Sequence, residues 1–133
     1  MATFRRFEDI AAWKKSRELT RNVYQASKRG AFARDFGLTD QIRRATVSIM
    51  SNIAEGHERS GTREFMQFLA TAKGSAAEVR SQLYVAFDQQ YLSVEEFSQL
   101  TTLALEVGRT IGGLMRYLRQ SEYKGTKYRL AKE

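Results

Sequence analysis

The single histidine, His57, limits the catalytic chemistry that this 133-residue chain can carry. A carboxylate-bridged di-metal site in a helical bundle uses Glu-x-x-His on two helices, and no glutamate stands three residues before His57. The chain has no cysteine, so thiolate ligands and thiol nucleophiles are excluded. The phosphate-binding patterns G-x-G-x-x-G and G-x-x-x-x-G-K-[ST] are also absent. We therefore expect a protein that is not an enzyme and that uses no metal or cofactor.

Two polar residues, Asn52 and Glu55, interrupt a largely apolar helical face. A buried amide or carboxylate costs a few kcal/mol unless a partner satisfies it. We expect both residues to be buried polar groups, with two interpretations. In the first, Asn52 fixes the register of the helices and Glu55 pairs with Arg43, Arg44 or an arginine of a neighbouring helix. In the second, the two residues line a site for a ligand or partner.

Positive charge is concentrated at the two ends of the chain. The net charge is +7 and the sequence pI is about 9.9. Residues 1–29 carry eight Lys or Arg against three Asp or Glu, and residues 116–133 carry six against two. The middle of the chain is slightly acidic, with eight against ten. A localised excess of this kind is an electrostatic footprint for a polyanionic partner.

Apolar periodicity predicts the helices that position these groups. The expected helices are Glu8–Lys28, Thr39–His57, Arg63–Gln90 and a fourth that starts at the capping box Ser93–Glu96, with a loop over Arg29–Gly37. There is no proline to interrupt them. Short connections between long helices predict an all-α, antiparallel up-down-up-down four-helix bundle over residues 1–120. Residues 121–133 form a basic C-terminal tail, which we expect to be a frayed end or an arm.

The third expected helix has two apolar lines. One line is the core face, and the other lies about a quarter-turn away at Met66, Ala70, Ala77, Tyr84 and Tyr91. The second line is either part of a wide buried arc or the interface of a homo-oligomer. On the fourth helix, Ala104, Gly108 and Gly112 make a stripe of small residues, which predicts close approach of another helix from this chain or another.

In the antiparallel topology, one end of the bundle collects the start of the first helix, the turn between the second and third helices, and the end of the fourth helix. On the first helix, Lys14, Arg17, Arg21 and Lys28 form a basic stripe that is either a solvated face or a phosphate-binding ridge. The predicted nucleic-acid-binding residues are Arg5, Arg6, Lys14, Arg17, Arg21, Lys28, Arg59, Arg63, Arg116 and Arg119.

No signal peptide and no apolar run of about 18 residues occurs, so we expect a soluble, cytoplasmic protein.

A set of short motifs resembles a bacterial family named after 23S rRNA intervening sequences. The motifs are FGL at 36–38, QIRRA at 41–45, SNIAEG at 51–56 and KGSAAE at 73–78, and the resemblance runs from about Phe7 to Leu118. It implies a four-helix bundle. It also implies a relationship to an accessory protein of diversity-generating retroelements, a basic pentameric bundle that works with a reverse transcriptase.

Charge and resemblance together favour a non-catalytic, oligomeric protein that binds RNA or DNA without sequence specificity, as an accessory or scaffold. The resemblance favours a pentamer. The alternative is a protein–protein interaction scaffold without nucleic-acid binding. We expect no membrane partner and no small-molecule substrate.

Overall fold

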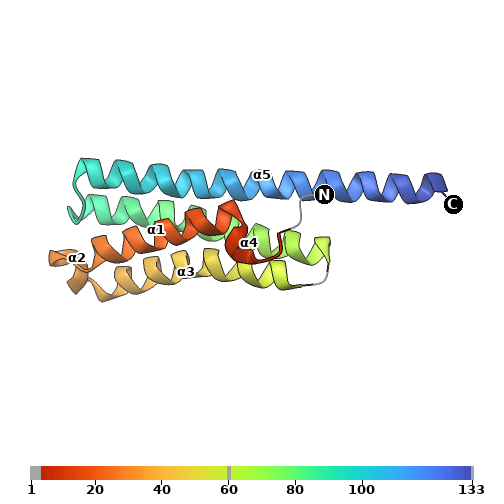
Figure 1. Ribbon diagram of the computed structural model, residues 1–133. Helices are drawn as coiled ribbons and strands as arrows, with labels where there is room; N and C mark the ends of the chain where they lie inside the picture. The colour runs from red at the N-terminus through yellow and green to blue at the C-terminus, as the bar shows by residue number, and fades with distance from the viewer. Residues whose placement is uncertain (1–3, 60, 133) are drawn as a thin grey trace.

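Four long helices run antiparallel in the structure, a computed structural model (Figure 1). It describes the backbone of residues 4–59 and 61–132, and the side chains of these ranges up to residue 121. The elements are η1 (Phe7–Asp9), α1 (Ala11–Ser27), α2 (Gly30–Arg34), α3 (Phe36–Glu58), α4 (Thr62–Asp88) and α5 (Val94–Lys132). This confirms the predicted all-α bundle with up-down-up-down topology.

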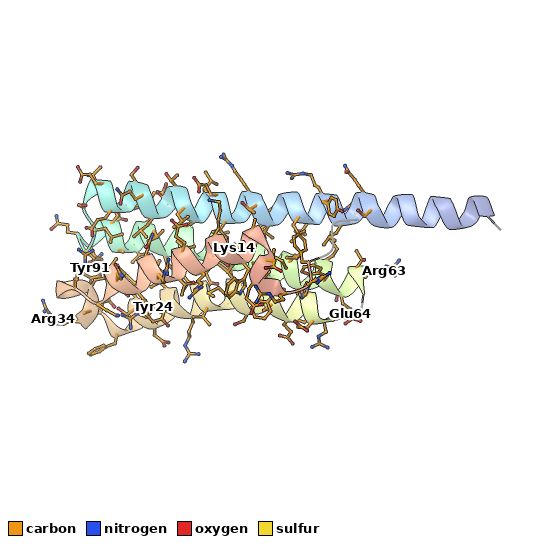
Figure 2. All side chains as sticks on the ribbon, in the orientation of Figure 1. Lys14, Tyr24, Arg34, Arg63, Glu64 and Tyr91 are labelled. Carbon is orange, nitrogen blue, oxygen red and sulfur yellow. The ribbon has the colours of Figure 1, made fainter. Side chains whose placement is uncertain are left out.

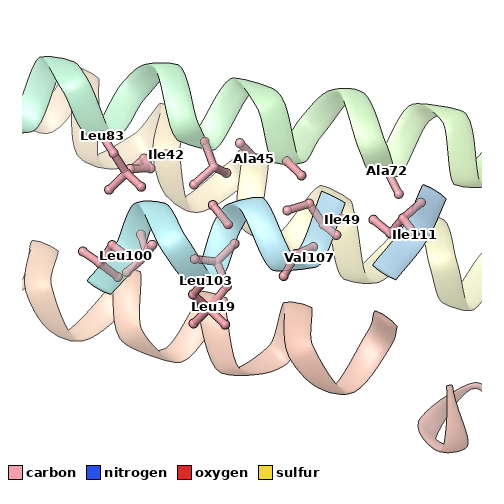
Figure 3. Close-up of a cluster of buried hydrophobic side chains, with 14 of the residues drawn as sticks. Leu19, Ile42, Ala45, Ile49, Ala72, Leu83, Leu100, Leu103, Val107 and Ile111 are labelled. Atoms are coloured by element: carbon pink, nitrogen blue, oxygen red, sulfur yellow. The ribbon is translucent and has the colours of Figure 1, made fainter. Parts of the chain in front are cut away.

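The apolar faces of the four long helices meet in one core (Figure 3). Helix α3 packs on α4, α4 packs on α5, and α1 packs on both α3 and α5. Ile49, which the periodicity of α3 predicts to be a core residue, has no exposed surface. The predicted core line of α4 is buried throughout: Phe65, Leu69, Ala72, Ala76, Val79, Leu83 and Ala86.

The segment between α1 and α3 contains a short helix, where the sequence analysis predicts a loop. Gly30 opens α2 with a φ of +54°, a left-handed conformation that glycine adopts without strain. Phe32 is buried, and its carbonyl oxygen accepts a hydrogen bond of 2.9 Å from Thr39 Oγ1. Asp35 then caps α3 by accepting a 3.1 Å hydrogen bond from the Leu38 amide. These contacts hold a five-residue helix that is too short for a periodic apolar pattern to predict.

The turn from α4 to α5 is closed by hydrogen bonds on both sides. The Gln90 and Tyr91 amides donate to the carbonyl oxygens of Phe87 and Ala86, at 2.9 Å each, which is the Schellman pattern for a helix end. Gln90 adopts a φ of 64° at the position that favours glycine. The predicted capping box starts α5: the Ser93 amide donates to Glu96 Oε1 at 3.0 Å, and the Glu96 amide donates to Ser93 Oγ at 3.1 Å.

Helix α5 continues as helical backbone through Lys132, where the composition predicts a frayed end or an arm. An established helix extends at low cost, because each added residue gains a backbone hydrogen bond for the loss of one residue's freedom. In Figure 1 this end of α5 projects past the other helices. The expected boundary at residue 120 stays a prediction, and the side chains of residues 122–133, which make up nearly all of the expected tail, lie outside the described part of the chain.

Helices α3 and α4 approach each other closely at Gly56. The predicted small-residue stripe on α5 makes no such close contact at Gly108 with another described helix. A Cβ placed on Gly56 would lie 2.7 Å from Phe68 Cβ and 2.9 Å from Phe65 Cδ1, so α3 and α4 are nearly in backbone contact there. A Cβ on Gly108 would meet nothing within 4 Å. The stripe on α5 therefore faces an open groove.

Candidate functional site

The basic stripe on α1 is exposed along its whole length. We call Lys14, Arg17, Arg21 and Lys28 the α1 ridge. The guanidinium carbon of Arg17 lies 5.8 Å from the centre of the Trp13 ring. Lys14, Arg17 and Arg21 line a hollow of about 320 Å³ on this ridge. Two carboxylates, from Glu8 and Glu18, also line this hollow and reduce its positive potential.

A second group of cations lies where α1 begins, α3 turns into α4, and α5 passes. We call this group the basic end; its exposed members are Arg5, Arg6, Arg59, Arg63 and Arg119. Figure 2 shows Arg63 and Glu64 there. Arg6 pairs with Asp9 at 3.3 Å, and Arg59 pairs with Glu55 at 2.8 Å. Arg5, Arg63 and Arg119 form no ion pair within the described part of the chain.

Two further predicted residues have other neighbours. Lys28, the last member of the α1 ridge, lies at the end of α1 away from the basic end. Arg116 sits beside Lys73, because their side-chain nitrogens both come within 3.7 Å of the position that a Gly112 Cβ would take. Lys73 is eleven residues beyond Thr62, which is about 16 Å along α4 from the turn. The backbone of Arg116 is one helical turn before Arg119 of the basic end, and its side chain reaches toward Lys73.

His57 is an anchor for the start of the chain. Its side chain is 16% exposed, and Nε2 lies 2.6 Å from the Phe4 carbonyl oxygen. The other ring nitrogen, Nδ1, is buried without a hydrogen-bond partner and lies 3.6 Å from Glu58 Oε1. Nε2–H therefore donates to Phe4, and the ring joins the N-terminal segment to the end of α3.

The polar residues of the SNIAEG segment have separate environments. Asn52 is half-buried and donates to the Ser48 carbonyl oxygen at 2.8 Å and to Ser48 Oγ at 3.1 Å. Ser48 Oγ lies 3.0 Å from Ser75 Oγ, which links α3 to α4. The expected burial of Glu55 is wrong for the single chain: it points to solvent and pairs with Arg59, one turn away on its own helix. The first interpretation of Asn52, a structural network, agrees with these contacts.

The adjacent arginines of α3 diverge as their spacing predicts. Arg43 turns inward, donates to Ser27 Oγ at 2.9 Å and lies over the Tyr24 ring at 4.6 Å. Arg44 points outward and pairs with Asp40 at 2.9 Å. Neither contacts Glu55.

The second apolar line of α4 is only partly covered. Met66 and Tyr91 are half-buried against the core, whereas Ala70, Ala77 and Tyr84 are exposed. Tyr84 has 58% of its surface exposed. The wide-arc interpretation therefore fits only the two ends of the line, and the exposed middle remains a candidate oligomer interface.

Tyr91 is engaged within the chain, at the end of the bundle opposite the basic end (Figure 2). Its hydroxyl donates to Asp35 Oδ2 at 2.8 Å, and its ring stacks on Phe32 with centroids 5.3 Å apart. The hydrogen bond to Asp35, together with burial and the negative charge of that carboxylate, raises the pKa of the Tyr91 hydroxyl. At the same end, the Ser93 amide and then Arg29 lower the pKa of Glu96.

Three cations that the sequence analysis did not select complete a basic groove between α4 and α5. Lys73 and Arg80 of α4 face Arg109 and Arg116 of α5 across a hollow of about 260 Å³. The sequence does show that the two cations of each helix are seven residues apart. It does not show that the two pairs face each other, because this depends on how one helix is rotated against the other.

By its fold and surfaces, the protein is a small antiparallel four-helix bundle with basic surface patches. None of its described helices is long and apolar enough to cross a membrane.

The chain belongs to the 23S rRNA-intervening sequence protein family, whose profile matches residues 8–113. Among solved structures it is similar to a protein of unknown function from the S23 ribosomal protein family of Bacteroides thetaiotaomicron. The TM-score is 0.72 and the identity 20%, over 79% of this chain and 98% of that one, so the likeness shows the fold. No curated protein matches the chain.

Proposed function

We propose that this chain is a non-catalytic protein that binds the backbone of RNA or DNA and works as an accessory or scaffold. One observation carries the proposal: Lys14, Arg21, Arg5, Arg63 and Arg119 are exposed cations without an ion pair in the described part of the chain. Uncompensated cations on one surface attract a polyanion and release its counterions on binding.

The expected recognition is by charge and shape. Trp13, the aromatic residue beside the cations of the α1 ridge, is half-buried and covered by Arg17, so it offers little free ring surface for base stacking. Phosphate contacts position a protein on nucleic acid without reading the sequence. We therefore expect similar affinity for mixed sequences of equal length and charge.

Assembly would strengthen such binding. The exposed residues Ala70, Ala77 and Tyr84 support a homo-oligomer, and the resemblance to the retroelement accessory protein favours a ring of five. Several copies would present the same basic surface to one strand, which raises avidity without new contacts. Light scattering at micromolar concentration is expected to give a mass above that of the monomer. A monomer mass would remove the oligomer from the proposal, and a dimer or tetramer would remove only the pentamer.

The test of binding is a salt titration with labelled mixed-sequence RNA and DNA. One variant replaces Lys14, Arg17 and Arg21 with Gln, and a second replaces Arg5, Arg63 and Arg119 in the same way. Each phosphate contact contributes about −0.7 on single strands and −0.9 on duplex DNA to the slope of log K against log salt. We expect at least one variant to weaken binding and to flatten the slope by roughly 2.

A matched control variant loses the same number of positive charges, but at cations that already form ion pairs within the chain. Lys15, Arg29 and Arg44 contact Glu106, Glu96 and Asp40, so replacing all three with Gln removes compensated charge. We expect this variant to bind nearly as the unmodified protein does. No binding of the unmodified protein at ~50 mM salt, where a basic assembly should bind non-specifically, would contradict the proposal. It would favour the alternative scaffold function instead.

A further inference from the structure

Among the described residues, those that line the groove between α4 and α5 include four cations and no acidic residue. Lys73 and Arg80 form its α4 wall, and Arg109 and Arg116 form its α5 wall. All four are exposed, and none makes an ion pair within the described part of the chain. Four uncompensated positive charges around one hollow repel one another, so the groove gains stability when negative charge enters it.

The two walls have the same spacing. Each pair of cations is separated by seven residues, which places both members on one side of their helix about 10.5 Å apart. Two parallel rows of charge with a seven-residue repeat are the pattern that flanks the seam of a coiled coil.

The floor of the groove is aliphatic and consists of alanines, glycines and Leu105. Ala104 and Gly112 are buried at its base, and Gly108 has free space above it, since a Cβ added there would meet nothing within 4 Å. No aromatic side chain lines the groove. Such a floor accepts apolar side chains of another helix but gives nucleic-acid bases no ring to stack on.

We infer that this groove docks an amphipathic helix of a partner protein, with a small apolar face toward the floor and carboxylates on both flanks. The apolar face would fill the space above Gly108, and the carboxylates would pair with the two rows of cations. A second copy of this chain does not supply such a helix, because none of its helices carries two acidic residues seven positions apart. The proposed homo-oligomer therefore forms beside the groove, whose lining shares only Ala77 with the candidate oligomer interface. This docking site is independent of the proposed nucleic-acid surface.

The probe is a synthetic three-heptad peptide with Leu and Ala at the seam positions and Glu on both flanks. Its identical repeats remove any dependence on register, and repulsion between its glutamates keeps it monomeric at neutral pH. Binding is followed by fluorescence anisotropy and by the gain of helical circular dichroism. We expect a dissociation constant in the micromolar range, and at least tenfold weaker binding when every Glu is replaced by Gln.

Gly108→Leu blocks the groove from its floor, and Gly74→Leu is the matched control. Both glycines lie within helices and have nothing within 4 Å of an added Cβ, but only Gly108 lines the groove. We expect Gly108→Leu to weaken peptide binding at least tenfold without any loss of stability in urea unfolding, and Gly74→Leu to bind normally. Replacing Arg80 and Arg109 with Gln is a second route that leaves the floor intact, with the same expected loss.

Three outcomes would overturn the inference. The first is no binding of the acidic peptide at about 200 µM. The second is binding that neither Gly108→Leu nor the arginine variant weakens. The third is displacement of the peptide by mixed-sequence RNA together with loss of RNA binding in Gly108→Leu, which would assign the groove to nucleic acid.

Discussion

Replacing Gly56 with Ala tests the close contact of α3 and α4 directly. The new Cβ would lie 2.7 Å from Phe68 Cβ and 2.9 Å from Phe65 Cδ1. Carbon atoms in good contact are about 3.5–4.0 Å apart. Phe68 Cβ is bonded to the backbone of α4 and does not move away by a side-chain rotation, so the two helices must separate locally by about 1 Å.

The expected loss of stability follows from two opposing terms. Overpacking in a well-packed core costs about 1–3 kcal/mol. Alanine gains up to about 1 kcal/mol over glycine inside a helix, and less near its end, where Gly56 lies two residues before the last residue of α3. We therefore expect the free energy of unfolding to fall by about 1–2 kcal/mol. With a urea m-value of about 1–3 kcal/mol/M, the midpoint should drop by roughly 1 M.

Two other glycines supply the control with the same chemical change. Gly74 and Gly108 lie within helices, and an added Cβ at either meets nothing within 4 Å. Alanine at these positions should raise the free energy of unfolding by about 0.5–1 kcal/mol, because only the helix term remains. Urea titrations of the three variants, followed by circular dichroism, compare the signs. A gain for Gly56→Ala equal to that for Gly74→Ala would refute the close contact between α3 and α4.

Three further changes probe the core and the turn between α4 and α5. Ile49→Ala should lower the free energy of unfolding by about 2–5 kcal/mol; a loss below ~0.5 kcal/mol in urea titration would mean that the core face of α3 is wrong. Gln90→Gly should raise it by about 1 kcal/mol by relieving the positive φ, and an unchanged midpoint would contradict that strain. Because the Ser93 amide and Arg29 lower the pKa of Glu96 from its ordinary value of 4.5, this carboxylate stabilises the fold above that pH and less as it is protonated. Urea titrations between pH 6 and 3 should therefore show a smaller loss of stability in Glu96→Gln than in the unmodified protein, and equal losses would refute the assignment.

The faces of the long helices were predictable because their apolar residues repeat at helical spacing. Ile49 and Val79 are buried as this repeat requires, and the capping box at Ser93 starts α5 with both of its hydrogen bonds. Helix α2 was missed because it is shorter than two turns, and it depends on tertiary contacts of Phe32. The sequence therefore predicts a helix when the helix is long enough to show a periodic pattern of apolar residues.

The candidate sites were less predictable because they depend on how helices are placed against one another. Exposure of the cations of the α1 ridge follows from one helix alone. Two placements depend on how the helices are rotated and offset against one another. Lys73 lies near Arg116, and Glu55 pairs with Arg59 instead of lying inside the bundle. The SNIAEG segment, which carries the family resemblance, has a structural role at Gly56, where α3 and α4 approach closely.

The carboxylate of Asp35 couples two turns at the same end of the bundle. One oxygen holds the first turn of α3 through the Leu38 amide, and the other holds Tyr91, which is 56 residues away in the turn between α4 and α5. Local opening of either turn removes a partner that orients the same side chain. In native-state hydrogen exchange, the amides of Leu38 and Tyr91 should therefore belong to one cooperative unit, even though no helix joins them directly.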